Sequence, residues 1–355
     1  NVYDGATWNV EFSNNPAWIC YDILTQPVIK DDNSIDRYEG IDPSRLDYAA
    51  FKTWADWCDV LVPDGAGGTE KRFTFNGVFD SEKTMWESAW DVCQQGRAAL
   101  VWRGRNLTVV IDKAENPVQL FSVGNIKSGS FRETFLSLDD RASELEVDFI
   151  NSEKGYERDK ISVFNTGLNR PSNKTSIQMV GCVKASEAWR HATYRLLNNQ
   201  YIIRTIEFDV DVDSLACTVG DVIRIQHDIP QWGFGGRVVS STNDSITFDK
   251  EVTIAAHKTY QVAVRRANSD TVEVKTVTSG AGTSKTISIA PATWTSNPAL
   301  YDIWSFGEVD IAYKNFRIKE IRRAGDQTAN ITALEYRSEI YADDWTWYTP
   351  LQRTV

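Results

Sequence analysis

The chain has 355 residues, of which 42% are hydrophobic, and a formal net charge of −11 from 38 Lys and Arg against 49 Asp and Glu. A chain of this size and composition can bury two or three hydrophobic cores, and its apolar runs are shorter than the about 18 residues of a membrane span. The acidic residues are dispersed, which argues against a stable grip on nucleic acid, because phosphate binding needs clustered positive charge. They keep the protein in solution by mutual repulsion or, in a narrower hypothesis, form a surface past which DNA slides.

The first two predicted helices each begin at a capping residue followed by proline. Asn15 and Asp42 can accept hydrogen bonds from the first helical amides, and proline tolerates the next position because it has no N–H to satisfy there. Apolar residues then recur at i, i+3, i+4 and i+7, which predicts one buried stripe on each helix. The stripes are Ala17, Cys20, Tyr21 and Leu24 in the first helix, which Pro27 ends, and Phe51, Trp54, Ala55 and Cys58 in the second.

A third predicted helix follows Asp80 or Ser81, either of which can cap it, and Gly96 offers a left-handed stop. Its stripe is Trp86, Ala89, Trp90 and Cys93. Apolar runs at 97–104 and 106–112 then meet at Gly104-Arg105-Asn106, which is a hairpin signal. The runs at 130–138, 143–150 and 160–165 are expected to continue the same antiparallel sheet, with the helices packed against it.

The pattern changes after a fourth predicted helix at 184–198, whose stripe is Ala185, Ala188, Trp189 and Ala192. From Tyr201 onward, short alternating runs separated by Gly, Asn and Asp predict a small barrel or sandwich, and the last two strands form a hairpin through Gly325-Asp326. The predicted fold class is therefore α+β and rich in strands. The expected domains are an α+β domain at 1–180, a helix and connecting strand at 181–215, a small β-barrel or sandwich at 216–310, a closing hairpin at 311–342 and a Trp-rich extension at 343–355.

Two stretches resemble ligand-binding loops without meeting their requirements. The segment "SGAGTSKT" at 279–286 has serine where a phosphate loop needs its two glycines, and it fits a hairpin loop better. The segment "DVDVDSLACTVG" has Ser214 and Gly220 where a calcium loop needs Gly and Glu. Its three aspartates are expected on the solvent face of a strand: Asp209, Asp211 and Asp213.

Residue types that often carry chemistry show no matching spacing. The five cysteines include no C-x-x-C pair, which favours buried thiols over metal ligands or disulfides. The three histidines are expected at ordinary polar positions, and Asp139-Asp140 and Asp343-Asp344 as surface acids rather than the acid pair of a glycoside hydrolase. We therefore assign no catalytic, cofactor-binding or metal-binding residue and expect no cofactor. The cysteines and histidines are Cys20, Cys58, Cys93, Cys182, Cys217, His191, His227 and His257.

Thirteen tryptophans are an unusual number for a chain of this length. Several lie beside turns and polar residues, where they are expected to be exposed: Trp232, Trp294, Trp345 and Trp347. Exposed aromatic rings suit either a protein interface or sugar stacking, and of these the interface is favoured.

The order of several segments resembles the tip attachment proteins J, the central tail hubs of phages with long non-contractile tails. The resemblance starts at "NNPAWICYDILTQP" and continues through "RFTFNGVFDSEKTMWESAWDVCQQGRAALVWRGRNLTVVID". It then follows "TVGDVIRIQHD", "GGRVVSS", "SITFDKEV" and "NFRIKEIRRAGDQTANITALEYRSEIYA". The set covers most of residues 1–342, and its specificity comes from the order of the segments rather than from any single motif.

The resemblance implies a structural hub protein and not an enzyme. It implies three copies around the tail axis at the distal end of the virion, which contact tube-end and distal tail proteins and the tape-measure protein. Receptor contact in this family is made by more C-terminal regions, of which only residues 343–355 are present here. DNA would pass through the channel without specific binding, and the acidic surface would repel its phosphates.

The resemblance also gives the predicted domains their roles. Residues 1–180 would form the hub domain, 181–215 would return to it, and 311–342 would close it. Because the chain begins with Asn1 partway into the hub region, we expect it to be part of a longer protein. Two other functions remain open: a protein that binds or hydrolyses cell-surface polysaccharide, and the hub of a contractile injection machine.

Overall fold

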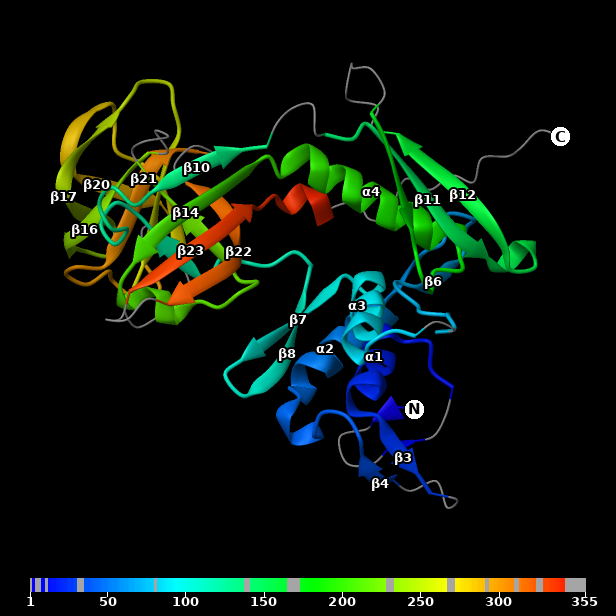
Figure 1. The fold of residues 1–355 in the computed structure, drawn as a ribbon. Helices are drawn as coiled ribbons and strands as arrows, with labels where there is room; N and C mark the ends of the chain where they lie inside the picture. The colour runs from blue at the N-terminus through cyan, green and yellow to red at the C-terminus, as the bar shows by residue number, and fades with distance from the viewer. Residues whose placement is uncertain are drawn as a thin grey trace. The chain divides into compact units, whose positions relative to one another are not determined.

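The computed structural model describes residues 2–3, 8–9, 12–30, 35–79, 82–136, 141–164, 173–227, 233–266, 272–290, 294–309, 313–323 and 328–341. Contacts divide the chain into two units, each built from separate segments (Figure 1). Unit 1 comprises Asn1–Ala114, Leu138–Gln200 and Glu339–Val355, and unit 2 comprises Glu115–Ser137 and Tyr201–Ser338. The predicted α+β, strand-rich fold class is confirmed, and no helix in the described ranges is long and apolar enough to span a membrane.

Helix α1 (Pro16–Thr25) begins and ends as its sequence predicts. The Asn15 side chain accepts from the Ala17 amide at 2.9 Å, Pro16 occupies the first turn, and the whole predicted stripe is buried. Gln26 takes a left-handed conformation, and its amide donates to the Asp22 carbonyl at 2.8 Å. The helix therefore stops one residue before Pro27, which cannot continue it.

Helix α2 (Tyr48–Asp59) carries its predicted buried stripe but starts later than expected. Asp42 caps only a short 3₁₀ turn (Pro43–Arg45), whereas Asp47 caps the α-helix by accepting from the Ala50 amide at 3.2 Å. Asp47 also accepts from the hydroxyl of Thr108 at 2.9 Å on the neighbouring hairpin. The tertiary contact therefore favours the second capping residue over the first.

Helix α3 (Met85–Gln95) departs from the prediction at both ends and on one face. Thr84 caps it through a capping box with Glu87, and not Asp80 or Ser81, which lie outside the described residues. Trp86 and Trp90 are 40% and 42% exposed, while Ala89, Val92 and Cys93 face the core. The predicted tryptophan stripe is therefore wrong, because the buried face of this helix is lined by smaller residues.

Gly96 ends α3 without the left-handed conformation that the sequence suggested. Its φ is −93°, and Arg97 takes the positive φ instead. A Cβ at Gly96 would lie 2.5 Å from the Trp54 ring, whose Nε1 donates to the Gly96 carbonyl at 2.8 Å. Glycine is needed here for the close approach of an indole, not for its freedom in φ.

The predicted hairpin is formed by β7 (Ala98–Arg103) and β8 (Asn106–Ile111), which make a two-stranded sheet. The expected continuation of this sheet is wrong. β11 (Glu144–Asn151) lies between antiparallel β12 (Glu157–Phe164) and parallel β13 (Lys174–Gln178) in a separate three-stranded sheet. Helix α4 (Ala185–Tyr201) packs Ala188, Ala192 and Leu196 against that sheet.

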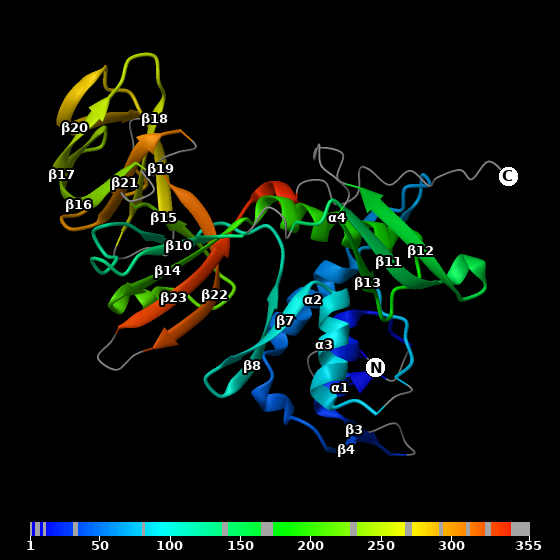
Figure 2. The same ribbon diagram turned by 45° about the horizontal axis from the view of Figure 1, so that its top comes forward.

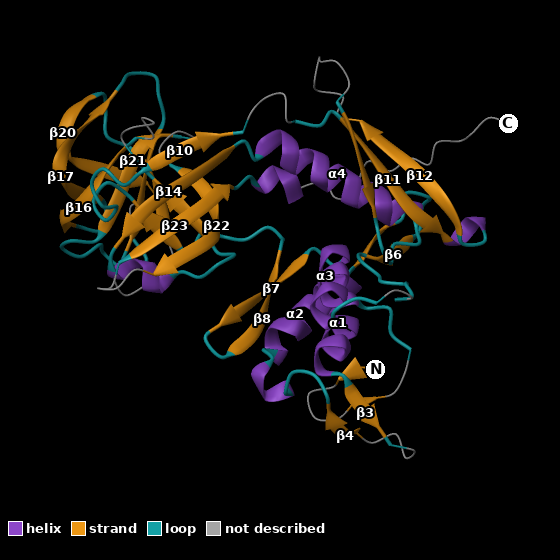
Figure 3. Ribbon diagram, viewed as in Figure 1, coloured by secondary structure: helices purple, strands orange, loops and turns teal. Residues whose placement is uncertain are grey.

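Unit 1 also contains four short two-stranded pairings, of which the hairpin β7–β8 is the longest. The others pair β1 with β2, β3 with β4, and β5 with β6. Figure 3 shows helices α1, α2 and α3 grouped beside the β7–β8 hairpin. The bounds of the short strands are Val2–Tyr3, Trp8–Asn9, Pro27–Ile29, Ile35–Tyr38, Leu61–Pro63 and Thr69–Lys71 for β1 to β6 in order.

Unit 2 contains a six-stranded sheet in the order β10-β14-β23-β22-β15-β9. Strand β10, which the sequence assigned to the first sheet, instead pairs with β14. The core of the sheet is formed by side chains such as Phe208, Phe316 and Ile331. The bounds are Arg132–Phe135 for β10, Arg204–Val210 for β14, Ala329–Glu335 for β23, Lys314–Arg323 for β22, Val222–Ile225 for β15 and Gln119–Phe121 for β9.

The remaining strands of unit 2 close into a barrel in the order β16-β17-β20-β19-β18-β21 (Figure 2). Trp304 is fully buried in it, stacked on Phe248 at 3.9 Å, and its Nε1 donates to Asp249 at 3.0 Å. The predicted hairpins β19–β20 and β22–β23 are both present, although the turn Gly325-Asp326 lies outside the described residues. The barrel strands are Phe234–Ser241, Ser245–Ile254, Tyr260–Arg265, Val272–Val277, Gly282–Ala290 and Ile303–Glu308 for β16 to β21 in order.

Candidate functional site

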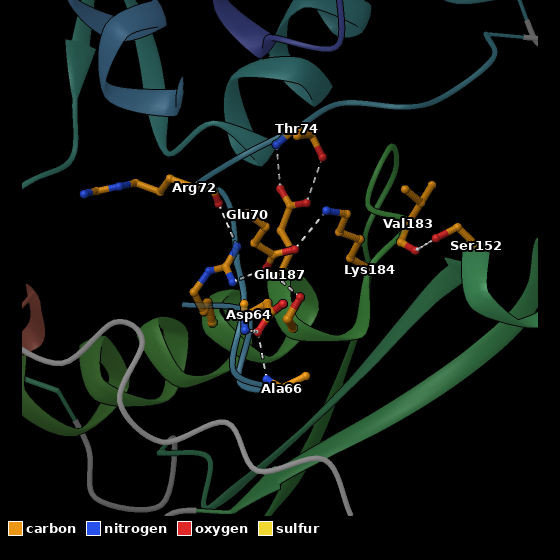
Figure 4. Close-up of polar contacts among 12 residues, drawn as sticks. Asp64, Ala66, Glu70, Arg72, Thr74, Ser152, Val183, Lys184 and Glu187 are labelled. Carbon is orange, nitrogen blue, oxygen red and sulfur yellow. Dashed lines mark hydrogen bonds and ion pairs between the residues drawn. The ribbon is translucent and has the colours of Figure 1, made fainter. Parts of the chain in front are cut away.

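The most unusual chemistry in unit 1 is a set of buried polar side chains on helix α4. Ser186, Glu187, Arg190 and His191 are each at most 8% exposed, although the sequence analysis considered only the apolar side of this helix. They lie on the side opposite Ala188 and Ala192 and meet the segment at residues 70–74, as Figure 4 shows for Glu70, Thr74 and Glu187. Helix α4 is therefore buried on two faces, one apolar and one polar.

Glu70 on β6 forms the first half of this polar set. Its carboxylate accepts from the Ser186 hydroxyl at 2.6 Å, from Arg190 Nη1 at 2.5 Å and from Lys184 Nζ at 3.0 Å. Burial would raise the pKa of the Glu70 carboxyl, but the hydrogen bonds from Ser186 and Arg190 outweigh it and hold the pKa below its usual value. Glu70 is therefore a charged anchor whose oxygens are fully engaged by the protein.

Glu187 forms the second half. It accepts from the Thr74 amide at 2.9 Å and the Thr74 hydroxyl at 3.0 Å (Figure 4). It also accepts from Gln95 Nε2 at 2.9 Å, so it joins α4 to α3 and to the segment that follows β6. Burial raises the pKa of the Glu187 carboxyl to about 7, against the opposing effect of the Thr74 amide and of Arg190. This carboxyl therefore changes its charge near neutral pH.

His191 lies beside these carboxylates without bonding to them. Its ring packs on Phe73 with centroids 4.8 Å apart, and burial, together with Arg97 and Arg195, lowers the pKa of the imidazole well below its ordinary value. His227 in unit 2 is also buried, stacked on Phe131 at 4.2 Å, whereas His257 is exposed. The expectation of ordinary polar positions is therefore wrong for His191 and His227, because both imidazole rings are buried and pack against phenylalanine rings.

The other candidate residues are dispersed. All five cysteines are buried and free, as predicted, and the Sγ atoms of Cys20 and Cys93 lie 3.6 Å apart between α1 and α3. Trp294 is 7% exposed in the barrel core, so its expected exposure is wrong. The other candidates lie outside the described residues: Trp232, Trp345, Trp347, Asp139, Asp140, Asp343 and Asp344.

The calcium-like aspartates do not share one strand face. Asp209 is the penultimate residue of β14 and accepts from Asn330 Nδ2 at 2.8 Å, whereas Asp213 lies in a 3₁₀ turn (Val212–Ala216) and accepts from Asn125 Nδ2 at 2.9 Å. Asp211 precedes that turn. Within the ranges that the structure describes, no three His, Cys, Asp or Glu side chains gather as metal ligands do.

These contacts assign the buried polar set a structural role. Glu70 and Glu187 are 8% and 1% exposed, and their oxygens already accept from side chains and amides of the chain. An acid pair that hydrolyses sugars needs one carboxyl facing water or substrate across a cleft. The apolar periodicity of α4 did not predict this set, whose signal in the sequence is a run of Ser, Glu, Arg and His at helical spacing.

Comparison with known proteins finds similarity to phage tail proteins. Residues 91–240 match a family described as putative phage tail protein. The chain is 27% identical over 361 residues to the tip attachment protein J of Escherichia phage SECphi27, covering 96% of this chain and 28% of that protein. It is 28% identical over 292 residues to the tip attachment protein J of Escherichia phage SECphi4, covering 80% and 25%. The chain thus spans about a quarter of the length of these curated relatives.

Two solved structures match parts of the chain at low identity. A chain of the native gene transfer agent virion matches with a TM-score of 0.43 and 9% identity, covering 78% of this chain and 44% of that chain. The tail protein from Neisseria meningitidis MC58 matches with a TM-score of 0.39 and 12% identity, covering 84% and 68%. By its sequence relatives the chain resembles the tip attachment proteins J over most of its length, as the order of its segments predicts, and residues 91–240 match a family described as putative phage tail protein.

Proposed function

We propose that the chain is a structural subunit of the tail tip, in which three copies form the hub that closes or continues the tail tube. The observation that carries this proposal is the similarity to tip attachment proteins J across 96% of the chain. In this role the protein supports tail assembly, host attachment and genome delivery. It acts at the distal tip of the virion after assembly in the host cytoplasm.

The proposed partners follow from that position. They are two further copies of the chain, the tube-end and distal tail proteins, and the tape-measure protein. The host receptor would be contacted by regions beyond those present here. The net charge of −11 supports a channel wall that repels the phosphates of passing DNA instead of binding them.

We propose no catalysis for this chain. The buried carboxylates of Glu70 and Glu187 serve as hydrogen-bond acceptors between strand, loop and helix segments of unit 1. Such an arrangement favours a rigid scaffold, because buried hydrogen bonds fix the relative positions of the elements they join.

Immunogold electron microscopy of the source phage tests the position. An antibody raised against this chain should label only the distal end of the tail, and preincubation with the purified chain should remove the label. Accessible particles that stay unlabelled, with the protein confined to soluble lysate, would overturn the proposal.

The proposed trimer is tested separately by light scattering of the purified chain over a concentration series. The expected mass is three times the 40.1 kDa of one chain. A species that remains monomeric at high concentration, both alone and with its tail partners, would contradict the trimer and leave the tail position standing.

A further inference from the structure

The edge of strand β11 is left open over a short stretch in unit 1. β13 pairs with β11 from Glu144 only as far as Asp148, whereas β12 pairs with it along the whole strand to Asn151. Beyond β13 the chain leaves the edge and returns where the Val183 carbonyl accepts from the Ser152 amide at 2.9 Å. The space between these points is a cavity of about 390 Å³, hereafter the Ile150 notch.

The backbone of Ile150 faces this notch. The Asp148 carbonyl accepts from the Met179 amide, and the Ser152 amide donates to Val183, so both residues direct these groups toward the β13 side. The Asn151 carbonyl accepts from Tyr156 on the β12 side. Because backbone groups alternate along a strand, the N–H and C=O of Ile150 point into the notch, where no described residue bonds to them.

A glycine explains why the pairing is interrupted. Gly181 has a φ of +84°, and a Cβ on it would lie 2.4 Å from the Phe75 ring. Its carbonyl accepts from the Asn76 amide at 2.8 Å, so the chain at this point pairs with residues 75–76 instead of β11. The notch is therefore built by a defined turn that a side chain at Gly181 would disturb.

The walls of the notch combine apolar and cationic groups. Ile150, Val180 and Val78 are 46%, 37% and 85% exposed. Arg158 stands directly opposite Ile150 on β12 and, within the described residues, has no ion-pair partner. Lys160, the neighbouring cation, is already bound by Glu146 at 3.0 Å and Asp148 at 3.1 Å.

From these observations we propose that the Ile150 notch binds an extended peptide segment of another protein, in which a carboxylate side chain lies next to aliphatic residues. The segment adds its backbone to the open edge of β11, its aliphatic side chains contact Ile150 and Val180, and its carboxylate pairs with Arg158. The edge from Asp148 to Ser152 spans about 13 Å at the usual rise of a strand, which accommodates a few extended residues. The proposal rests on unit 1 alone and goes beyond the proposed place in the tail.

Fluorescence anisotropy with three labelled peptides tests this proposal on the full chain. The first is acetyl-Thr-Val-Thr-Asp-Thr-Val-Thr-amide, in which the aspartate and both valines share one face of the strand, the second has lysine in place of aspartate, and the third is the first with an N-methylated amide at the aspartate. The acidic peptide should bind about tenfold more tightly than either of the others, because only it supplies both the carboxylate and the strand donor. Equal affinity for all three peptides, or no binding by the acidic one, would overturn the proposal.

Variants locate the binding site. Arg158→Ala and Val180→Glu should each weaken binding of the acidic peptide by about tenfold, through loss of the cation or introduction of a repelling carboxylate. Arg105→Ala, in the exposed turn of the β7–β8 hairpin, is the matched control and should leave the affinity unchanged. Hydrogen exchange at the Ile150 amide should slow when the peptide is bound. Binding that is unaffected by both notch variants would place the peptide elsewhere and refute the assignment.

Discussion

Arg190 and Glu70 form a buried ion pair in which Nη1 lies 2.5 Å from Oε1, with the two side chains 2% and 6% exposed. The second nitrogen of the same guanidinium, Nη2, donates to the Arg72 carbonyl at 2.8 Å. Helix α4 is thereby attached both to the carboxylate of strand β6 and to the backbone that follows it. The ion pair holds the polar side of α4, whereas Ala188 and Ala192 pack its apolar side against the three-stranded sheet.

Replacing Arg190 should destabilise unit 1 strongly. Arg190→Leu removes the buried cation and leaves Glu70 with Lys184 and Ser186 alone, so we expect a loss of about 3–5 kcal/mol in the free energy of unfolding. Urea denaturation followed by tryptophan fluorescence measures it. Lys52→Ala, which breaks the exposed pair with Asp56, is the control and should change the free energy by less than about 1 kcal/mol. Equal effects of the two substitutions would contradict the buried anchor.

Glu187 should make the stability of unit 1 depend on pH near neutrality. The pKa of its carboxyl is raised from 4.5 to about 7 in the folded protein, so the unfolded chain binds fewer protons between these values. Its contribution to stability is therefore complete below about pH 4.5 and is lost as the pH rises through about 7. Arg190 and Gln95 face the same carboxyl. His191 makes the stability depend on pH in the opposite direction, because the pKa of its imidazole is lowered in the folded protein.

Glu187→Gln isolates this contribution, since His191 is present in both proteins. The difference in unfolding free energy between wild type and variant should favour wild type more at pH 5 than at pH 8, by on the order of 3 kcal/mol. Urea titrations at the two pH values provide the comparison. A difference that does not change with pH would show that Glu187 does not titrate in this range.

Substitutions at two glycines with positive φ distinguish the cost of backbone strain from the cost of a steric clash. Gly181 and Gly104 have φ values of +84° and +62°, but a Cβ at Gly104 meets nothing within 4 Å. Gly104→Ala should therefore cost only about 1 kcal/mol, whereas Gly181→Ala adds the clash with the Phe75 ring and should cost about 3 kcal/mol. Thermal unfolding of both variants would reveal the difference, and equal melting temperatures would argue against the close packing at Gly181.

The cysteines should be unreactive in the native protein. All five are buried, and burial raises the pKa of the thiols of Cys20, Cys58 and Cys182 and that of Cys217 to about 12. Because the thiolate is the reactive form, a chromogenic aromatic disulfide should modify none of them within minutes under native conditions. The same reagent should modify all five in guanidinium chloride. Rapid reaction of one or more thiols in the folded chain would contradict their burial.

Local signals predicted several elements correctly. The Asn15-Pro16 start of α1, the apolar stripe of α2 and the hairpin at Gly104-Arg105 depend on capping, periodicity and turn chemistry, which act over a few residues. The order of segments was also sufficient to predict the resemblance to tip attachment proteins J. The predicted strands after Tyr201 include five of the six that form the closed barrel, and the sixth, β21 (Ile303–Glu308), was not predicted.

Contacts between distant residues decided what the sequence left open. Asp47 rather than Asp42 caps α2 because it also bonds Thr108, and β10 joins β14, more than 65 positions later, rather than the strands nearer to it. Trp86 is exposed although it belongs to the predicted apolar stripe. Glu187 and Arg190 are buried, because Thr74 and Glu70 provide hydrogen-bond partners that no local pattern reveals. Short-range physical chemistry determined elements such as α1 and the β7–β8 hairpin. Only the tertiary structure decided which residue caps α2 and which polar groups could be buried, because both depend on partners distant in the chain.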